Sequence, residues 1–144
     1  MNQKYYFILL TLIFISCKKN EPVDNSSPLE KLTSGTSKSW KYLESKTEGK
    51  SDLGPCNNDD RLIFNVLTSK LLIDRGTVKC FVSEENKEFT FGISADGKVL
   101  SIDQESYDVL SFTKKMMKLV SRNAQHEGGE VHNHLIEITL EAVN

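Results

Sequence analysis

The middle of the chain contains the stretch Phe89-Thr-Phe-Gly-Ile-Ser-Ala-Asp-Gly-Lys-Val-Leu-Ser-Ile102. Large apolar residues alternate with small or polar ones on both sides of Asp96-Gly97, which is the period of a β-strand with one buried face. An Asp-Gly pair between two such runs is a strong hairpin signal, because both central residues of the tight turn take positive φ. The stretch therefore predicts two antiparallel strands joined by a tight turn.

The same two-residue period recurs on both sides of this hairpin. The other runs lie at residues 39–42, 61–66, 71–73, 78–82, 110–112, 117–119 and 135–141. About eight short strands with turn signals between them and no amphipathic helix favour a sandwich or barrel. Short connections favour a meander, and closing a meander removes exposed sheet edges. We therefore predict an all-β fold, a small antiparallel up-and-down barrel of about eight strands over residues 35–144.

One face of each predicted strand is apolar. By parity, the inward residues are Trp40, Tyr42, Leu62, Phe64, Val66, Leu71, Ile73, Phe89, Phe91, Ile93, Leu100, Ile102, Leu110, Phe112, Leu119, Ile136, Ile138 and Leu140. Eight strands enclose an interior that side chains just fill or that holds one small ligand. A filled interior is the favoured interpretation. The alternative is an apolar ligand pocket, with an aromatic lining made up of Trp40, Tyr42, Phe64, Phe91 and Phe112.

These inward positions bring no titratable groups together, so the pattern predicts no catalytic site and no enzyme. The formal net charge is -2 at pH 7, with acidic and basic residues nearly balanced. Nucleic acid is therefore not an expected partner.

The first residues have the features of a signal peptide. Lys4 precedes an apolar segment, Tyr5 to Ser16, which is shorter than the roughly 20 residues that span a bilayer. A small residue followed by Cys17 resembles the lipobox of bacterial lipoproteins, in which the cysteine becomes the lipidated first residue. We therefore predict a signal peptide over residues 1–16 and lipid attachment at Cys17. The alternative is a secreted protein in which this cysteine is incidental.

Residues 17–34 are predicted to form a disordered, lipidated tether. The segment is rich in Ser, Asn, Pro and charged residues, so it buries too little apolar surface to offset its ordering entropy. Two or more acyl chains attach a protein stably to a bilayer, since each buried methylene contributes about 0.8 kcal/mol. The membrane is therefore an expected partner. The expected location is the bacterial envelope, at the outer membrane, after export.

Two cysteines remain after Cys17, namely Cys56 and Cys80. In an oxidising compartment they are expected to form a disulfide, closing a loop of about 25 residues and contributing roughly 3–4 kcal/mol. A zinc site would need further ligands at suitable spacing, and a catalytic thiol would need an activating base. The sequence around the two cysteines supplies neither.

Two polar clusters contain side chains of the kinds that bind metal ions. All three histidines of the chain, His126, His132 and His134, lie near its end, and three nitrogen ligands with a water can hold zinc. Their spacing matches no established zinc motif, so a solvated loop is preferred and no cofactor is predicted. Asp59 and Asp60 lie outside any calcium-loop pattern and are interpreted as turn-capping residues.

Several of these features occur together as Cys17, Leu32-Thr-Ser-Gly-Thr-Ser-Lys-Ser-Trp40, Cys56-Asn-Asn-Asp-Asp60 followed by Phe64, and Gly76-Thr-Val-Lys-Cys80. With them the chain resembles the lipocalin-like domain lipoproteins of Gram-negative bacteria. The resemblance implies a small β-barrel with Trp40 as the plug of one end. It also implies a non-enzymatic envelope lipoprotein that binds a small apolar ligand. The alternative function is a protein-interaction or inhibitor module of the cell envelope without such a ligand.

Overall fold

The computed structural model describes residues 24–121, 124–125, 131–132 and 135–143. In chain order the elements are α1 (Pro28–Thr33), β1 (Ser37–Thr47), β2 (Lys50–Ser51), η1 (Pro55–Asn57), β3 (Arg61–Asn65), β4 (Lys70–Asp74), β5 (Lys87–Ile93), β6 (Val99–Ile102), β7 (Glu105–Phe112), β8 (Met116–Ser121), β9 (Ala124–Gln125), β10 (Val131–His132) and β11 (Ile136–Ala142). No helix in these ranges is long and apolar enough to cross a membrane. The predicted signal peptide and Cys17 lie outside the described residues.

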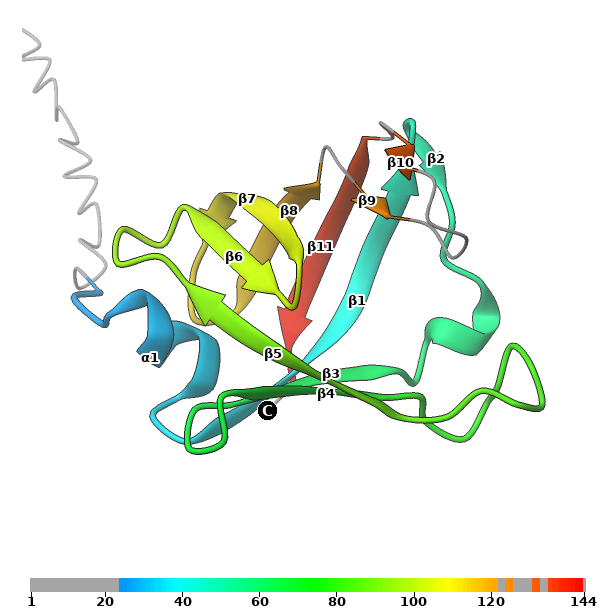
Figure 1. Ribbon diagram of the computed structural model, residues 1–144, viewed down its shortest axis with the longest axis horizontal. Helices are drawn as coiled ribbons and strands as arrows, with labels where there is room; N and C mark the ends of the chain where they lie inside the picture. The colour runs from blue at the N-terminus through cyan, green and yellow to red at the C-terminus, as the bar shows by residue number, and fades with distance from the viewer. Residues whose placement is uncertain (1–23, 122–123, 126–130, 133–134, 144) are drawn as a thin grey trace, which may run out of the picture.

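Eight strands form a closed antiparallel barrel (Figure 1). Their order around the barrel is β1-β3-β4-β5-β6-β7-β8-β11, and β11 pairs with β1 to close the ring. Each strand therefore lies beside its neighbour in the chain, and the predicted up-and-down barrel is confirmed. The strand predicted over residues 78–82 does not form, since these residues belong to the loop between β4 and β5. The short β2 extends a hairpin from β1, and β9 pairs with β10 in a separate two-stranded sheet.

The hairpin over residues 89–102 forms as β5 and β6, with Ile93 opposite Leu100. The turn differs from the expected one. Within the Asp96-Gly97 pair, only Gly97 has a positive φ, 71°. Asp96 instead stabilises the turn with its side chain, which accepts a hydrogen bond from the Lys98 amide at 3.1 Å. Aspartate commonly stabilises a turn in this way.

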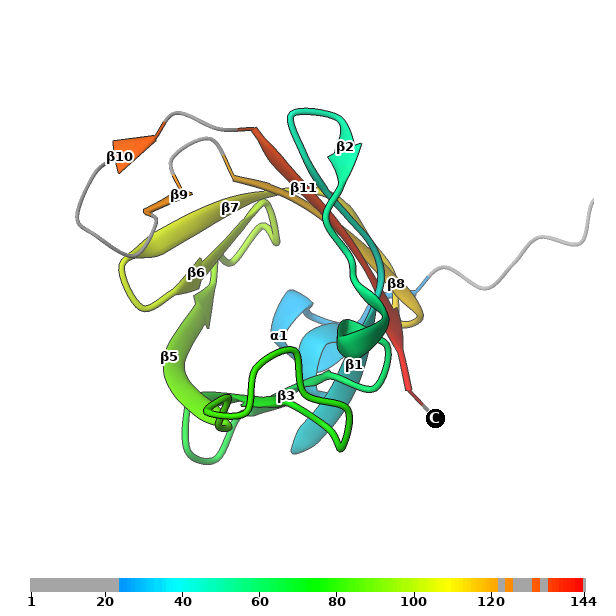
Figure 2. The same ribbon diagram turned by 90° about the vertical axis from the view of Figure 1, so that its right-hand side faces the viewer.

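Helix α1 closes one end of the barrel. The Glu30 amide donates a hydrogen bond to the Ser27 hydroxyl, which caps the first turn. Leu32 is fully buried, and its carbonyl accepts a hydrogen bond from Trp40 Nε1 at 3.0 Å. Figure 2 looks into the barrel from the other end and shows α1 across it. Residues 28–33 were predicted to be part of the disordered tether, but they form a helix that contributes to the core. Leu32 packs beside Trp40, a contact that the composition of the segment does not predict.

The core lies next to α1 and extends along the barrel wall. Its buried members are Leu32, Trp40, Leu62, Phe64, Leu71, Leu100, Met117, Leu119 and Leu140. Most of them belong to the predicted inward set. The strict alternation of the strands therefore identified most of the core correctly.

Leu110 departs from that set, since 65% of its surface is exposed. The pairing of β7 with β8 shifts register between Val109 and Ser111. This irregularity turns Leu110 outward and places Val109 against the core. A second register shift, in β1, leaves Leu43 exposed. A β-bulge adds one residue to a strand and reverses the parity on one side of it, so a fixed period of two cannot anticipate it.

Candidate ligand-binding cavity

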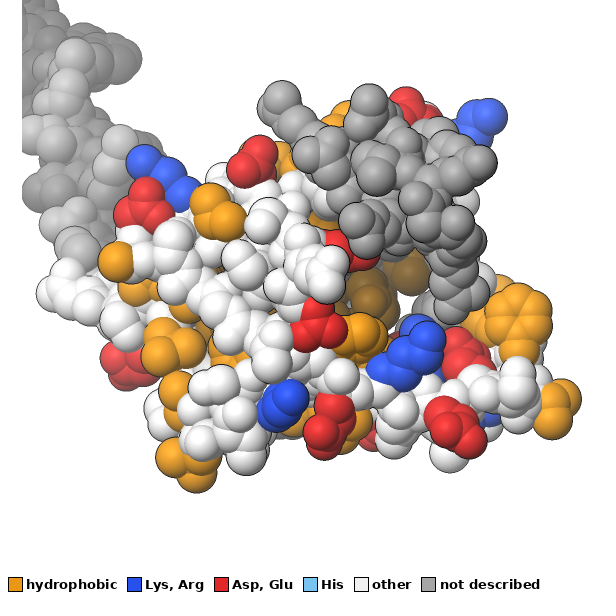
Figure 3. Space-filling model, viewed as in Figure 1, with side chains coloured by type: hydrophobic (Ala, Val, Ile, Leu, Met, Phe, Trp, Pro, Cys, Tyr) orange, Lys and Arg blue, Asp and Glu red, His pale blue; other side chains and the backbone are white. Residues whose placement is uncertain are grey.

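The barrel is hollow at the end opposite α1. The hollow is a cavity of about 410 Å³, lined by Tyr42, Leu62, Phe64, Leu71, Ile73, Phe89, Ile102, Asp103, Gln104, Glu105, Tyr107, Leu119, Ile138 and Leu140. Figure 3 shows recessed hydrophobic side chains in this region with charged side chains beside them. Sites for small molecules typically measure about 300–1,000 Å³. The favoured expectation of a filled interior is therefore wrong for this end of the barrel.

Of the five aromatic residues predicted to line a pocket, Tyr42 and Phe64 do so. Phe91 instead packs edge-on against Phe64, with ring centroids 5.1 Å apart. Trp40 and Phe112 pack together, with centroids 6.2 Å apart. These last three side chains do not line the cavity. Alternation indicates which side chains point inward, but it does not indicate their height along the barrel.

Tyr107 and Glu105 line the cavity although neither belongs to the predicted inward set. Counting by twos back from Leu110 would put both on the outer face, and the bulge in β7 reverses that parity. The signal that could have found them is the alternation Glu105-Ser-Tyr107-Asp-Val109, read without extending it through the bulge.

Two tyrosine hydroxyls provide polar groups in this apolar setting. Burial raises the pKa of Tyr42 to about 12. Burial also raises the pKa of Tyr107, and so does its hydrogen bond to Glu105, in which the Tyr107 hydroxyl donates. Both phenols are therefore protonated at neutral pH. The Tyr42 hydroxyl forms no hydrogen bond with any residue that the structure describes, so it is available to a ligand.

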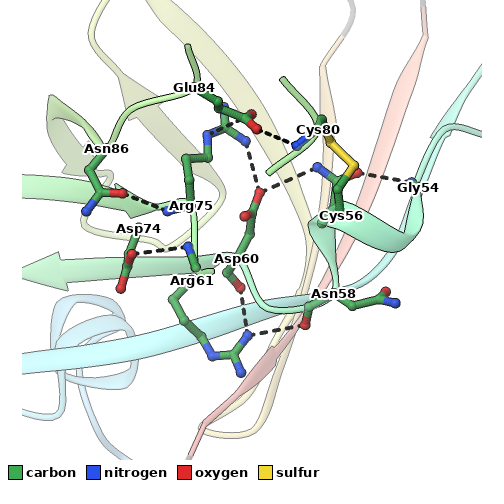
Figure 4. Close-up of polar contacts among 12 residues, drawn as sticks. Gly54, Cys56, Asn58, Asp60, Arg61, Asp74, Arg75, Cys80, Glu84 and Asn86 are labelled. Atoms are coloured by element: carbon green, nitrogen blue, oxygen red, sulfur yellow. Dashed lines mark hydrogen bonds and ion pairs between the residues drawn. A yellow bond between two sulfur atoms is a disulfide. The ribbon is translucent and has the colours of Figure 1, made fainter. Parts of the chain in front are cut away.

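The disulfide joins the two long loops at the open end (Figure 4). Cys56 and Cys80 form it as predicted, with their Cα atoms 5.2 Å apart. The loop between β4 and β5 is held further by Asn86, whose side chain accepts a hydrogen bond from the Arg75 amide at 2.9 Å. The open end thus keeps its shape through covalent and polar links, since the cavity provides no packed interior there.

A buried ion pair lies beside the disulfide (Figure 4). Arg75 Nη1 donates to Asp60 at 3.0 Å, and only 2% of the Asp60 side chain is exposed. Arg75 Nε lies 3.4 Å from the carboxylate of Glu84, which also accepts a hydrogen bond from the Cys80 amide at 3.0 Å. Arg75 therefore lies between two carboxylates, and Asp60 is an ion-pair residue and not the turn cap that was expected.

Asp59 does cap a turn, as predicted. One of its carboxylate oxygens accepts hydrogen bonds from the Thr77 amide at 2.7 Å and the Val78 amide at 3.1 Å. These backbone hydrogen bonds hold the pKa of Asp59 below its usual value. Asp59 therefore fixes the start of the β4–β5 loop.

Gly76 is required where this turn meets Asp59. Its φ is +58°, and a Cβ atom there would overlap the Asp59 carboxylate. We expect Gly76→Ala to lower the free energy of unfolding by roughly 1–3 kcal/mol through backbone strain alone, with the overlap adding to it. Urea unfolding measures the change. Gly35→Ala is the matched control, because Gly35 has a φ of +86° with nothing within 4 Å of its Cβ position. Equal losses in the two variants would contradict a role for the Asp59 contact.

The histidines considered as metal ligands cannot be placed around the cavity. His126 and His134 are not among the described residues, and only the backbone of His132 is described, where it pairs with Ala124. In the part of the chain that is described, no group of three or more His, Cys, Asp or Glu side chains could hold a metal ion.

No protein-family model matches the sequence, and no curated protein matches it either. Among solved structures, the chain is similar to bovine odorant-binding protein in complex with its natural ligand, at 14% identity and a TM-score of 0.46, over 81% of this chain and 74% of that one. It is also similar to bovine odorant-binding protein in complex with a selenium-containing odorant, at 14% identity and a TM-score of 0.48, over 88% of this chain and 78% of that one. The strand order by itself defines a lipocalin-like up-and-down barrel.

Proposed function

We propose that this protein binds a small apolar molecule inside its barrel, as a non-enzymatic lipoprotein of the bacterial envelope. The observation that carries the proposal is the cavity of about 410 Å³, whose wall is mostly aliphatic and aromatic. Its few polar groups lie on Tyr42, Tyr107 and the turn at residues 103–105. An apolar cavity with a small number of placed polar groups is the usual form of a small-molecule site.

The position of Asp24 indicates how an anchor at Cys17 would orient the barrel. Asp24 lies 3.2 Å from Lys114 Nζ and 3.9 Å from Lys31 Nζ, so the chain enters the domain at the end closed by α1. A lipid anchor preceding Asp24 would hold that end toward the membrane. The open end would then face away from the anchor, where a ligand can reach it.

Filling the cavity tests the binding function. Ile138 lines the cavity, and Ile138→Trp is expected to weaken binding of the apolar fluorescent probe N-phenylnaphthylamine by about tenfold or more, because the indole takes up space in which the probe buries its surface. Thermal unfolding is expected to stay at or above the wild-type midpoint, since the larger side chain enters empty space. A fluorescence titration of the purified protein measures the binding.

Leu72→Trp is the matched control, because Leu72 lies on β4 between the cavity-lining residues Leu71 and Ile73 and does not itself line the cavity. This variant is expected to bind the probe as the wild type does. Wild-type protein that binds no apolar probe and carries no small molecule in native mass spectrometry would contradict the proposed function. Unchanged binding by Ile138→Trp would contradict the location of the site.

A second candidate function is a protein-interaction module. The observation that favours it is an apolar tip on the β4–β5 loop, where 74% of Phe81 and 53% of Val78 are exposed and Val82 is fully exposed. The disulfide at Cys80 holds this tip in place. Exposed aromatic and aliphatic side chains on a rigid loop are typical anchors of protein interfaces. An empty barrel in native mass spectrometry, together with failure to bind any apolar probe, would favour this function over the first.

A further inference from the structure

The charged side chains that line the cavity, within the described part of the chain, are both acidic. They are Asp103 and Glu105, at the turn between β6 and β7. Asp103 accepts two hydrogen bonds of 2.7 Å from the hydroxyl and the amide of Thr90, which hold its pKa below the usual value. Asp103 is therefore ionised at neutral pH. One oxygen of Glu105 accepts the Tyr107 hydroxyl proton, which leaves the other oxygen free to meet a ligand.

No described cation compensates these two carboxylates from inside the cavity. Arg75 lies at the open end, but it is held at 3.0 Å by Asp60 and at 3.4 Å by Glu84. The charge of Lys70 contributes to the lowered pKa of Asp103, yet Lys70 does not line the cavity. The polar end of the cavity therefore favours a positively charged group over a negative one.

The tyrosines at this end offer the hydrogen bonds that such a group needs. The Tyr107 hydroxyl already donates its hydrogen bond to Glu105, so its oxygen can only accept a further hydrogen bond. Tyr42 is partly buried against the core, and its hydroxyl has no hydrogen-bond partner among the described residues. An ammonium group carries three donors and no acceptor, and aromatic faces attract cations in a desolvated setting. A carboxylate would instead meet two like charges and few donors.

We infer that the cavity selects an amphiphilic amine, with its protonated amino group beside Glu105 and its apolar body inside the barrel. The inference rests on the proposed binding function and specifies its ligand class. It follows from three features together: an apolar cavity, two carboxylates at one end of it with no cation among the described lining residues, and a tyrosine hydroxyl without a partner among the described residues.

Three probes with the same alkyl chain test this inference, namely decylamine, decanol and decanoate, each used below the concentration at which it forms micelles. Competition against N-phenylnaphthylamine on the purified protein measures their affinities. We expect decylamine to bind about tenfold more tightly than decanol, the factor that about 1.4 kcal/mol produces. Decanoate is expected to bind more weakly than decanol. Added salt is expected to reduce the advantage of the amine.

Glu105→Gln locates the selectivity. The glutamine carbonyl can still accept the Tyr107 hydroxyl proton, so the variant removes the charge while keeping the hydrogen bond. We expect the ratio of decylamine to decanol affinity to fall about tenfold, to near one. Glu88→Gln is the matched control, since it removes the same charge from an exposed position of β5 outside the cavity. It is expected to leave the ratio as in the wild type.

The outcomes separate the two proposals. Failure of all three probes and of N-phenylnaphthylamine to bind would overturn the proposed function, and the inference with it. Decanol or decanoate binding as tightly as decylamine would overturn the inference and leave the proposed function standing. The assignment of the amine to Glu105 would be overturned if the ratio of decylamine to decanol affinity stayed unchanged in Glu105→Gln. It would also be overturned if that ratio fell equally in Glu88→Gln.

Discussion

Trp40→Ala is expected to lower the free energy of unfolding by about 3–5 kcal/mol, the usual cost of removing a buried tryptophan from a core. Trp40 is fully buried and is the only tryptophan of the chain. Its loss would leave a void at the closed end of the barrel and would leave the Leu32 carbonyl without the donor at 3.0 Å. Helix α1 would thereby lose its main attachment to the barrel.

The contacts of Trp40 explain why its effect should be large. The ring packs against Phe112 at 6.2 Å, and Lys38 Nζ lies 4.5 Å from the ring centroid. Trp40→Phe would keep most of the buried surface and remove the hydrogen bond to Leu32. Its expected cost is therefore smaller, about 1–3 kcal/mol for a buried carbonyl left without a partner.

Urea unfolding followed by far-ultraviolet circular dichroism measures the free energy of unfolding of both variants. Tryptophan fluorescence is unsuitable, because both variants lack the single tryptophan of the chain. Leu43→Ala on the same strand is the control, since 53% of Leu43 is exposed and surface substitutions usually change stability by less than about 0.5 kcal/mol. A loss of less than about 1 kcal/mol in Trp40→Ala, well below the usual range, would show that α1 and Trp40 do not stabilise the closed end as described.

Removal of the Cys56–Cys80 disulfide is expected to lower the free energy of unfolding by roughly 3–4 kcal/mol, the chain-entropy value for a loop of this length. The two cysteines are separated by 24 positions and connect the loop before β3 to the loop after β4. The double variant Cys56→Ser, Cys80→Ser removes the link without leaving a lone thiol. Chemical reduction of the wild type should produce a loss of similar size.

Urea unfolding with and without reductant makes this comparison directly. The double serine variant is its own control, because reductant should not change its unfolding midpoint. Reductant that leaves the wild-type midpoint unchanged would contradict the stabilising role of the disulfide. We also expect the Asp60–Arg75 pair to hold the two loops together after reduction, so the barrel should remain folded in the absence of urea.

The two ends of the barrel are stabilised by different interactions. At the closed end, Leu32, Trp40 and Phe112 exclude water by packing. At the open end the interior is a cavity, so apolar packing cannot hold the loops. The disulfide and the buried pair of Asp60 with Arg75 do so instead. This division allows the barrel to keep a hollow without losing its shape.

The alternation of apolar and polar residues was enough to predict the eight strands of the barrel, their up-and-down order and most of the core, but it also predicted a strand over residues 78–82, which form part of the β4–β5 loop. Strand period and short connections are local properties, so they can be read along the chain. The disulfide followed from the number of cysteines and the expected compartment. The role of Trp40 at one end of the barrel was anticipated from the family resemblance, and its contact with Leu32 is in agreement with it.

The remaining features depend on contacts between distant segments, and only the tertiary structure shows them. The bulge between Val109 and Ser111 arises from the pairing of β7 with β8, and it brings Tyr107 and Glu105 to the cavity. The burial of Leu32 depends on a barrel end that no stretch of residues encodes alone. The cavity itself depends on how far side chains reach across the barrel, which alternation does not record, because parity assigns a side chain to a face but not to a height.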